Sequence, residues 1–162
     1  MKIAIVSDTH NRTDRVLRAV AEIRDRAVGT VIHCGDVTNA PVVELFAGLD
    51  AHFVLGNCDC DDGELRDAIE QINGTLHDGY GVLELDGKKL AFTHGHDYTR
   101  LQELLYSEAF DYVFHGHTHA AVDRYAGPTR LINPGALQRV SVPTFVILDL
   151  QTGEAETVEV RP

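Results

Sequence analysis

Side chains that commonly bind metal ions gather in five short segments of the sequence. Each segment contains Asp, Asn or His and directly follows a run of apolar residues. The five segments are Ser7-Asp8-Thr9-His10, His33-Cys34-Gly35-Asp36, Gly56-Asn57-Cys58-Asp59, Thr93-His94-Gly95-His96 and His115-Gly116-His117-Thr118-His119. Carboxylate, amide oxygen and neutral imidazole together suit divalent ions such as Mn, Fe, Ni or Zn. The candidates outnumber the ligands of one tetrahedral ion, and a carboxylate that bridges two ions accounts for the surplus.

The distribution of histidines supports this interpretation. A single His or Asp after a strand is usually a turn residue or a hydrogen-bonded core residue, so no position is convincing alone. Six of the nine histidines nevertheless fall in three of the segments, at positions 10, 94, 96, 115, 117 and 119. We expect His33 and His115 to pack structurally beside the turn glycines. His52 and His77 lie outside the pattern, and we expect them on the surface.

The apolar runs before the segments are short and are predicted to be buried strands. Between the first two runs, residues 12–28 carry apolar side chains at three- and four-residue spacing, which predicts an amphipathic helix that ends at Gly29. Asn39 is a candidate N-cap for a helix over residues 39–48. Since ligands bind at the carboxyl ends of strands in α/β sheets, five such ends can converge on one place.

The remaining elements follow from the same patterns. Asp86-Gly87 is a hairpin turn signal between two apolar runs. Strands are predicted over 2–7, 30–33, 51–55, 81–85, 89–93, 112–115, 121–125, 129–132, 144–150 and 154–160, and further helices over 63–72 and 98–110. This order predicts a mixed α/β domain with helices packed outside two sheets, formed as a single domain by residues 1–162.

Composition narrows the function classes. The net charge of −11 on 162 residues disfavours binding to a nucleic-acid backbone, so duplex nucleic acid is not an expected partner. No apolar run reaches the roughly 18 residues of a membrane span, and no signal-peptide cleavage site follows the N-terminal run. We therefore expect a cytoplasmic protein without membrane contact. Cys34, Cys58 and Cys60 do not form a disulfide framework pattern. Homo-oligomer formation stays open.

The five segments resemble, in sequence order, the ligand blocks of the calcineurin-like metallophosphoesterase superfamily. The matching residues are Asp8-Thr9-His10, Gly35-Asp36, Gly56-Asn57-Cys58-Asp59, His94-Gly95-His96 and Gly116-His117-Thr118-His119. Ile132-Asn133-Pro134-Gly135 resembles a further loop of the small YfcE-type phosphodiesterase branch. The resemblance covers residues 1 to about 150 and implies a β-sandwich of two mixed sheets flanked by helices.

The resemblance also implies a ligand set and a reaction. One divalent ion would be bound by Asp8, His10 and His119, a second by Asn57, His94 and His117, with Asp36 bridging both. Mn is favoured, with Ni, Fe or Zn as alternatives. The implied enzyme is a metal-dependent hydrolase in which a metal-bridging hydroxide attacks small phosphodiesters. Catalytic roles are expected for Asp36, Asn57 and His96, the last as an orienting or proton-donating group.

One position departs from many members of the family. They have His after the Gly-Asn pair, near the leaving group, whereas Cys58 stands there in this chain, as in the small phosphodiesterase branch. A neutral thiol with a reference pKa of about 8.5 is a poor proton donor. Asn11 and Arg12 are further candidates for phosphate contact, or else a helix cap and a solvated charge. Two alternatives stay open: a phosphomonoesterase using the same site, and a non-catalytic scaffold such as the retromer subunit that resembles this family.

Overall fold

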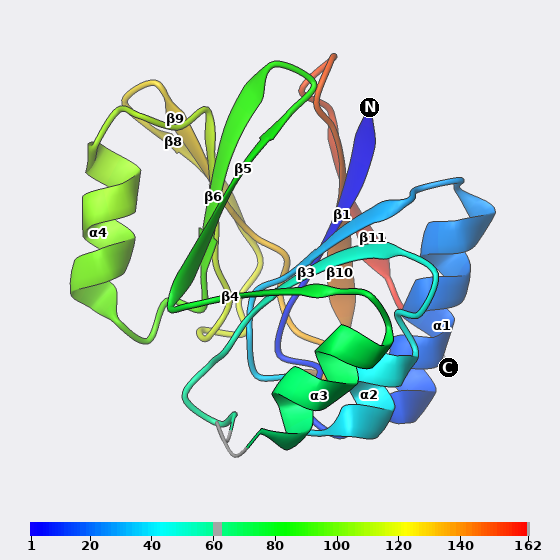
Figure 1. Cartoon of the computed structure of the whole chain (residues 1–162). Helices are drawn as coiled ribbons and strands as arrows, with labels where there is room; N and C mark the ends of the chain where they lie inside the picture. The colour runs from blue at the N-terminus through cyan, green and yellow to red at the C-terminus, as the bar shows by residue number, and fades with distance from the viewer. Residues whose placement is uncertain (60–62, 162) are drawn as a thin grey trace.

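The computed structural model describes residues 1–59 and 63–161, which form two β-sheets flanked by helices (Figure 1). The first sheet has six strands in the order β11-β10-β1-β2-β3-β4, and the second has five in the order β5-β6-β7-β9-β8. The strands are β1 (Lys2–Val6), β2 (Thr30–His33), β3 (Asp50–Val54), β4 (Thr75–His77), β5 (Tyr80–Leu85), β6 (Lys88–Thr93), β7 (Tyr112–Phe114), β8 (Val122–Ala126), β9 (Thr129–Asn133), β10 (Thr144–Asp149) and β11 (Ala155–Glu159).

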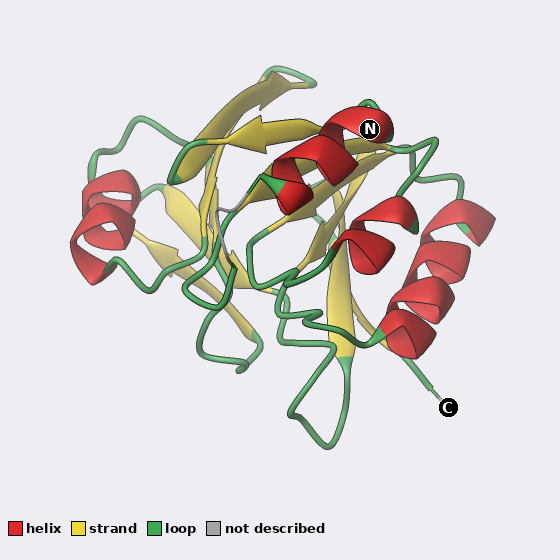
Figure 2. Ribbon diagram, turned by 60° about the horizontal axis from the view of Figure 1, so that its bottom comes forward, coloured by secondary structure: helices red, strands yellow, loops and turns green. Residues whose placement is uncertain are grey.

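The helices cover the outer faces of the two sheets. Helices α1 (Thr13–Asp25), α2 (Ala40–Glu44) and α3 (Glu64–Gln71) lie on one side of the molecule, and α4 (Tyr98–Tyr106) lies on the other (Figures 1 and 2). One core cluster joins the first three helices to the first sheet, and a smaller one joins α4 to the second sheet. A third cluster lies between the sheets. The predicted β-sandwich flanked by helices is therefore confirmed.

Strand β1 illustrates why the inner strands are apolar throughout. Ile3 and Ile5 belong to the cluster between the sheets, whereas Ala4 and Val6 belong to the cluster under the helices. Because successive side chains of a strand point to opposite faces, a strand covered on both faces needs apolar residues at every position. The polar residues that follow β1 therefore mark the place where the strand leaves the core.

Parallel pairing brings the strand ends to one edge. Strands β1, β2 and β3 pair parallel in the first sheet, and β6 pairs parallel with β7 in the second. Their carboxyl ends therefore point the same way within each sheet. A backbone hydrogen bond of 3.0 Å from Gly116 N to His94 O continues the β6–β7 alignment past the strands. One of 3.0 Å from Asp8 N to Gly35 O does the same for β1 and β2.

Some predicted boundaries were wrong. The helix predicted over 39–48 is only Ala40–Glu44, because the next residues form tight turns such as Phe46 N to Val43 O before Gly48 turns the chain at φ 80°. The predicted N-cap is confirmed, since Asn39 Oδ1 accepts the Val42 N–H at 3.2 Å. The helix predicted to end at residue 110 ends at Tyr106.

Strand β4 was not predicted. It has three residues, too few to show a two-residue periodicity, and it pairs parallel with β3 at the edge of the first sheet. Cys34 is a buried free thiol and Cys58 an exposed one, and Cys60 lies outside the described residues. Among the residues that the structure describes, no helix has the length and apolar character that membrane crossing requires.

Candidate metal centre

The structure brings all seven predicted ligands to one end of the β-sandwich. Each lies in the loop that follows a strand: Asp8 and His10 after β1, Asp36 after β2, Asn57 after β3, His94 after β6, and His117 and His119 after β7. Side chains from both sheets therefore meet where the two sets of parallel strands end. Their separations describe two adjoining groups that share Asp36.

The first group contains Asp8, His10 and His119. Each offers one ligand atom within 4.8 Å of those of the other two. Asp8 Oδ1 lies 3.1 Å from His119 Nε2. The Asp8 side chain is fully buried, and its other oxygen accepts hydrogen bonds from Ser7 Oγ at 2.6 Å and from the His117 backbone N–H at 3.0 Å. One carboxylate oxygen is thus fixed by the protein while the other faces the imidazoles.

Asp36 lies between the first group and the second. Its Oδ2 is 3.7 Å from His10 Nε2, and its Oδ1 is 3.4 Å from His94 Nε2. The Cys58 backbone N–H donates to Oδ1 at 2.9 Å. Asp36 therefore has one oxygen directed to a histidine of each group.

The second group is formed by Asn57, His94 and His117. His94 Nδ1 lies 2.8 Å from the Cys34 carbonyl, which can only accept, so Nδ1 carries the proton and a neutral ring presents a lone pair at Nε2. That Nε2 lies 3.1 Å from Asn57 Oδ1, a second acceptor. Two facing acceptors are favourable when a proton or a cation lies beside both. The His117 ring lies 5.1 Å from the His94 ring, centroid to centroid.

Unpartnered buried atoms test whether a cation fits. Asp8 Oδ1 and His10 Nε2 are buried and have no hydrogen-bond partner among the residues that the structure describes. A buried polar atom without a partner costs about 1–3 kcal/mol. Coordination of a cation would satisfy both atoms, and carboxylate with imidazole suits a borderline divalent ion. The donor set therefore fits metal binding.

The backbone of this site is strained. Five of the seven residues have left-handed φ angles: Asp8 (52°), His10 (45°), Asp36 (56°), His117 (66°) and His119 (57°). Such conformations cost residues other than glycine about 1–3 kcal/mol each and cluster at functional sites. Hydrogen bonds between the loops hold the strained residues, among them His10 N to Asp36 O at 2.8 Å. Left-handed turns at positions 8 and 10, and at 117 and 119, thereby bring residues close in sequence to the same centre.

Asp59 supports these loops, a role that the sequence did not reveal. Its Oδ2 accepts the backbone N–H groups of Asp36 at 2.8 Å and Gly56 at 2.7 Å, and its Oδ1 accepts that of Thr38 at 2.7 Å. One carboxylate therefore joins the loop after β2 to the loop after β3. Asp commonly accepts hydrogen bonds from nearby backbone groups in turns, but the sequence gives no signal for the two bonds to the other loop.

Charge in the centre follows from burial and close pairing. Burial lowers the pKa of His10, although Asp36 and Asp8 oppose it. Burial also acts against the charged form of His94, but the adjacent Asp36 outweighs it and raises the pKa of His94. Burial favours neutral Asp36, yet His94 and the Cys58 N–H hold the pKa of Asp36 well below the usual carboxyl range. Asp36 is therefore ionised, as a metal ligand must be.

The histidines beneath the site are structural, as predicted. His33 is fully buried, with Nδ1 accepting the Gly35 N–H at 3.2 Å and Nε2 lying 3.0 Å from Thr9 Oγ1. Burial lowers the pKa of His33 to about 3, so the ring is neutral. His115 is also buried, and its Nδ1 lies 3.0 Å from the Gly116 carbonyl.

The prediction that His52 and His77 are surface residues was wrong. His52 Nδ1 lies 3.2 Å from His77 Nε2, within hydrogen-bond distance. The His77 ring packs edge-on against Phe92, with ring centroids 5.0 Å apart. Both are partly buried because the unpredicted strand β4 places His77 beside β3. They form a separate pair, and neither belongs to a group of candidate metal ligands among the described residues.

Other predicted contact residues differ in their placement. His96 is exposed beside the second group, with its ring 5.4 Å from that of His94 and 6.3 Å from that of His117. Burial, followed by these two rings, lowers the pKa of His96. Arg12 does not face the site: its guanidinium binds Asp14 at 2.8 and 2.9 Å. Asn11 is exposed, and no contact to the centre identifies a role for it.

The centre opens into a cleft of about 470 Å³. The cleft is lined by His10, Asp36, Asn57, Cys58, His117, Thr118, His119 and Arg139. Arg139 was not among the predicted residues, because one arginine in a loop typically carries a solvated charge. Its positive charge acts to lower the pKa of both His10 and Cys58, two other residues that line the cleft.

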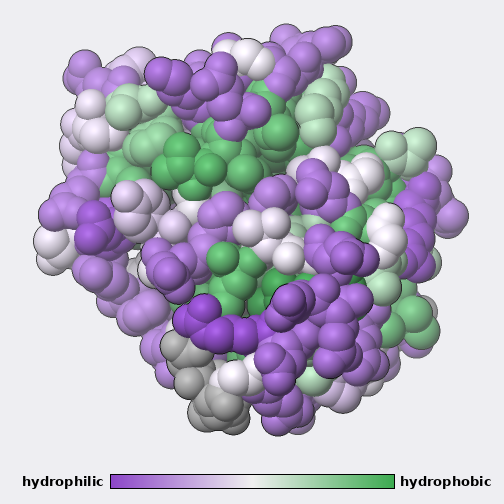
Figure 3. All heavy atoms as spheres, in the orientation of Figure 1, coloured by the Kyte–Doolittle hydropathy of each residue, from purple (hydrophilic) through white to green (hydrophobic). Residues whose placement is uncertain are grey.

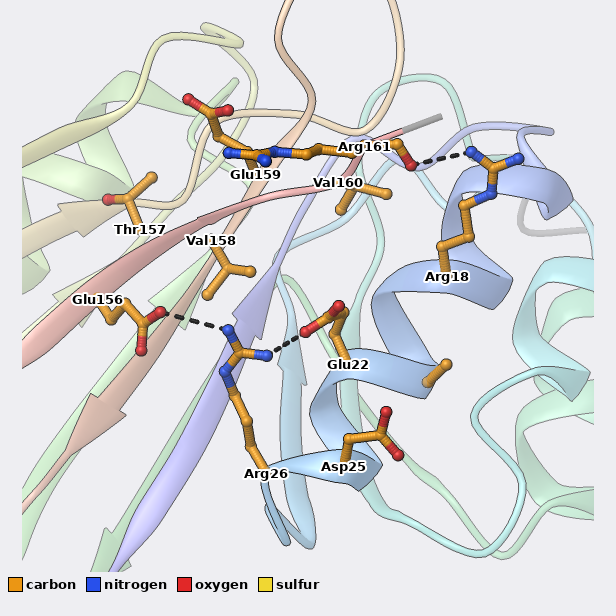
Figure 4. Close-up of a pocket in the computed structure, with 11 residues that line it drawn as sticks. Arg18, Glu22, Asp25, Arg26, Glu156, Thr157, Val158, Glu159, Val160 and Arg161 are labelled. Atoms are coloured by element: carbon orange, nitrogen blue, oxygen red, sulfur yellow. Dashed lines mark hydrogen bonds and ion pairs between the residues drawn. The ribbon is translucent and has the colours of Figure 1, made fainter.

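A larger hollow of about 710 Å³ lies between α1 and β11 (Figure 4). Several of its side chains contact each other or the backbone: Arg26 contacts Glu22 and, at 3.3 Å, Glu156, while Arg18 donates to the Arg161 carbonyl at 2.9 Å. None of its lining residues belongs to a cluster of candidate metal ligands among the described residues. Size alone therefore does not identify the functional site.

Comparison with known proteins agrees with the fold and with the family that the sequence resembles. Residues 1–153 match the calcineurin-like phosphoesterase superfamily domain. The chain is 35% identical over 159 residues to the phosphodiesterase MJ0936 of Methanocaldococcus jannaschii, covering 95% of this chain and 96% of that protein. A solved archaeal phosphodiesterase superposes with a TM-score of 0.91 at 33% identity, covering 98% of this chain and 99% of that one. The Escherichia coli phosphoesterase YfcE shares the fold, with a TM-score of 0.72 at 21% identity and coverage of 99% and 100%. The chain therefore belongs to the calcineurin-like phosphoesterase superfamily.

Proposed function

We propose that this protein is a metal-dependent phosphodiesterase that hydrolyses small phosphodiesters at the cleft into which the candidate metal centre opens. The observation that carries the proposal is the position of Asp36, whose two oxygens face His10 at 3.7 Å and His94 at 3.4 Å. A second support is the relative named a phosphodiesterase, at 35% identity over nearly the whole chain. We further propose that two divalent ions bind, manganese being the favoured one.

The roles of the residues follow from their positions. Asp8, His10 and His119 would hold one ion, Asn57, His94 and His117 the other, and Asp36 both. When bound, such a pair of cations supplies hydroxide at neutral pH and positive charge for phosphate oxygens. Asn57, on the exposed side of the centre, is also positioned to orient the phosphate. His96 is the group beside the second set of ligands that can accept or donate a proton at the leaving oxygen.

Charge favours a small substrate over a long polyanion. The chain carries a net charge of −11, and the face seen in Figure 3 is largely hydrophilic, with apolar atoms in separate patches. Two divalent ions would add +4 to the −2 of Asp8 and Asp36, so the centre itself would attract a monoanionic diester. A duplex nucleic acid would also meet the acidic periphery, which repels it.

Metal analysis combined with substrate comparison tests this function. The protein is purified without chelator, its metal content is measured, and turnover of bis(p-nitrophenyl) phosphate and p-nitrophenyl phosphate is compared for Mn, Ni, Fe and Zn. We expect two ions per chain and faster turnover of the diester. Faster turnover of the monoester would instead identify a phosphomonoesterase.

The scaffold alternative is tested by Asp36→Asn. Loss of a group that only supports a metal ligand typically costs about 10- to 100-fold. Removal of the shared carboxylate should therefore reduce diester turnover by more than about 100-fold. Undiminished turnover by this variant would exclude the proposed site. A protein that binds neither metal nor diester would support the scaffold function.

A further inference from the structure

We propose that Arg139 is a substrate-binding residue that contacts a phosphate oxygen and favours substrates with greater negative charge. The inference rests on the proposed function, since it assigns a part of the same cleft. Arg139 lines the cleft together with five of the candidate ligands: His10, Asp36, Asn57, His117 and His119. Its charge acts on His10 and Cys58, residues from two different loops that face the cleft.

The guanidinium of Arg139 is available for a ligand. The chain has 25 Asp and Glu against 14 Lys and Arg, so acidic partners are abundant. Arg26 and Arg130 both use such partners, at 3.3 Å from Glu156 and 2.7 Å from Asp123. Arg139 has neither an ion pair nor a hydrogen bond within the described parts of the chain, and it is exposed. A guanidinium that faces an anion site can donate a charge-assisted hydrogen bond to a phosphate oxygen.

The loop fixes the position of Arg139. Leu137, two residues before Arg139, is fully buried in the core, and its carbonyl accepts a hydrogen bond from Arg15 Nη1 at 2.7 Å. The Gln138 N–H donates to the carbonyl of Asp8 at 3.2 Å. Arg139 itself has φ 58°, a left-handed conformation that costs energy in a residue other than glycine. Its neighbours are thus anchored to α1 and to a candidate metal ligand, which holds the arginine at the edge of the cleft.

Binding of inorganic phosphate tests the proposal without relying on turnover. Manganese-loaded wild-type protein, Arg139→Gln, Arg139→Lys and Arg161→Gln are titrated with phosphate by calorimetry at pH 8, after their metal content has been measured. Arg161 lies beside the remote α1–β11 groove, so its variant removes the same charge elsewhere (Figure 4). We expect Arg139→Gln to weaken phosphate binding roughly tenfold, corresponding to one lost charge-assisted hydrogen bond, with unchanged metal content. Arg139→Lys should recover part of the loss, and Arg161→Gln should bind phosphate as the wild type does.

The kinetic counterpart distinguishes binding from structural support. Arg139→Gln should raise KM more than it lowers kcat, and more for the dianionic p-nitrophenyl phosphate than for the monoanionic bis(p-nitrophenyl) phosphate. Equal phosphate affinity in Arg139→Gln and wild type would overturn the proposal, as would an equal loss in Arg161→Gln or the absence of phosphate binding by the metal-loaded wild type. Failure of the wild type to hydrolyse either ester would contradict the phosphodiesterase function, whereas the phosphate titration would still test Arg139.

Discussion

The metal-centre cleft and the α1–β11 groove differ in how their polar groups are satisfied. The groove is larger, about 710 Å³ against 470 Å³, but Arg26 pairs with Glu22 and Glu156 within it, and the flanking helix and strand have a regular backbone. At the metal centre beside the cleft, Asp8 and His10 have buried atoms without a hydrogen-bond partner among the described residues, and five candidate ligands have a strained backbone. Folding alone does not favour such a region, so strain and unsatisfied ligand atoms indicate function better than volume does.

The largest expected effect comes from Gly56→Ala. A Cβ at this glycine would lie 2.1 Å from Asp36 Oδ1 and 2.6 Å from Asp36 N, so the carboxylate between the two ligand groups must move. We expect diester turnover to fall by more than about 100-fold, because displacement of a ligand exceeds the loss of a supporting group. Steady-state kinetics of the manganese-loaded variant would measure this.

Gly29→Ala is the matched control for this substitution. A Cβ there has nothing within 4 Å and φ is not positive, so the variant should retain turnover and gain about 0.4–1 kcal/mol of stability. If Gly56→Ala had the turnover of the wild type, displacement of the Asp36 carboxylate would have no more effect on activity than the substitution of Gly29. The contrast between the two hollows would then lose its functional meaning.

The second effect concerns the carboxylate that supports the loops. In Asp59→Asn, one of the two oxygens that accept the three backbone N–H groups is replaced by an NH₂ group. This NH₂ donor then faces at least one backbone N–H that has lost its acceptor. Metal affinity should fall about 10- to 100-fold, as for other groups that orient metal ligands. Calorimetric titration of the metal-free protein with Mn²⁺ measures the change. The exposed Asp67→Asn in α3 removes the same charge and should leave the affinity unchanged.

Short apolar runs that end in polar residues were sufficient to predict the mixed α/β fold with two sheets and the convergence of five polar segments. The set of seven candidate ligands within these segments was implied by the resemblance to the family. The sequence could not assign roles to Asp59 and Arg139. Asp59 acts through backbone groups of another loop, and Arg139 enters the cleft because Leu137 is buried nearby. Strand β4 was missed for a similar reason, since its three residues become a strand only through pairing with β3. Contacts between distant segments leave no periodic signal.

The third prediction concerns the contribution of His33, which is buried beneath the metal centre, to the pH dependence of the free energy of unfolding. His33 has a pKa near 3 when folded and about 6.5 when unfolded. Between these values only the unfolded chain binds the proton, so stability decreases as pH falls below about 6.5, by at most about 1.4 kcal/mol per pH unit. Urea unfolding of the metal-free protein at pH 7, 6 and 5 should show this loss. His33→Gln should have lower stability at pH 7 but a weaker dependence on pH.

Thr9→Val serves as the control for this measurement. It removes the contact of 3.0 Å to His33 Nε2 but keeps the buried imidazole, so the pH dependence should remain close to that of the wild type. An identical dependence in His33→Gln and wild type would assign the acid sensitivity to other groups. The buried imidazole of His33 would then have as little effect on the pH dependence of stability as an exposed charged side chain of the groove.

The smallest effect is expected in the groove itself. Glu156→Gln removes the exposed ion pair with Arg26, which retains its contact with Glu22. Pairs of this kind contribute about 0–1 kcal/mol, so the midpoint of urea unfolding should change little. Diester turnover and metal content should equal those of the wild type, because no candidate ligand among the described residues lines the groove. A loss of turnover at normal stability would mean that the groove influences the chemistry. The functional distinction between the cleft and the groove would then be wrong.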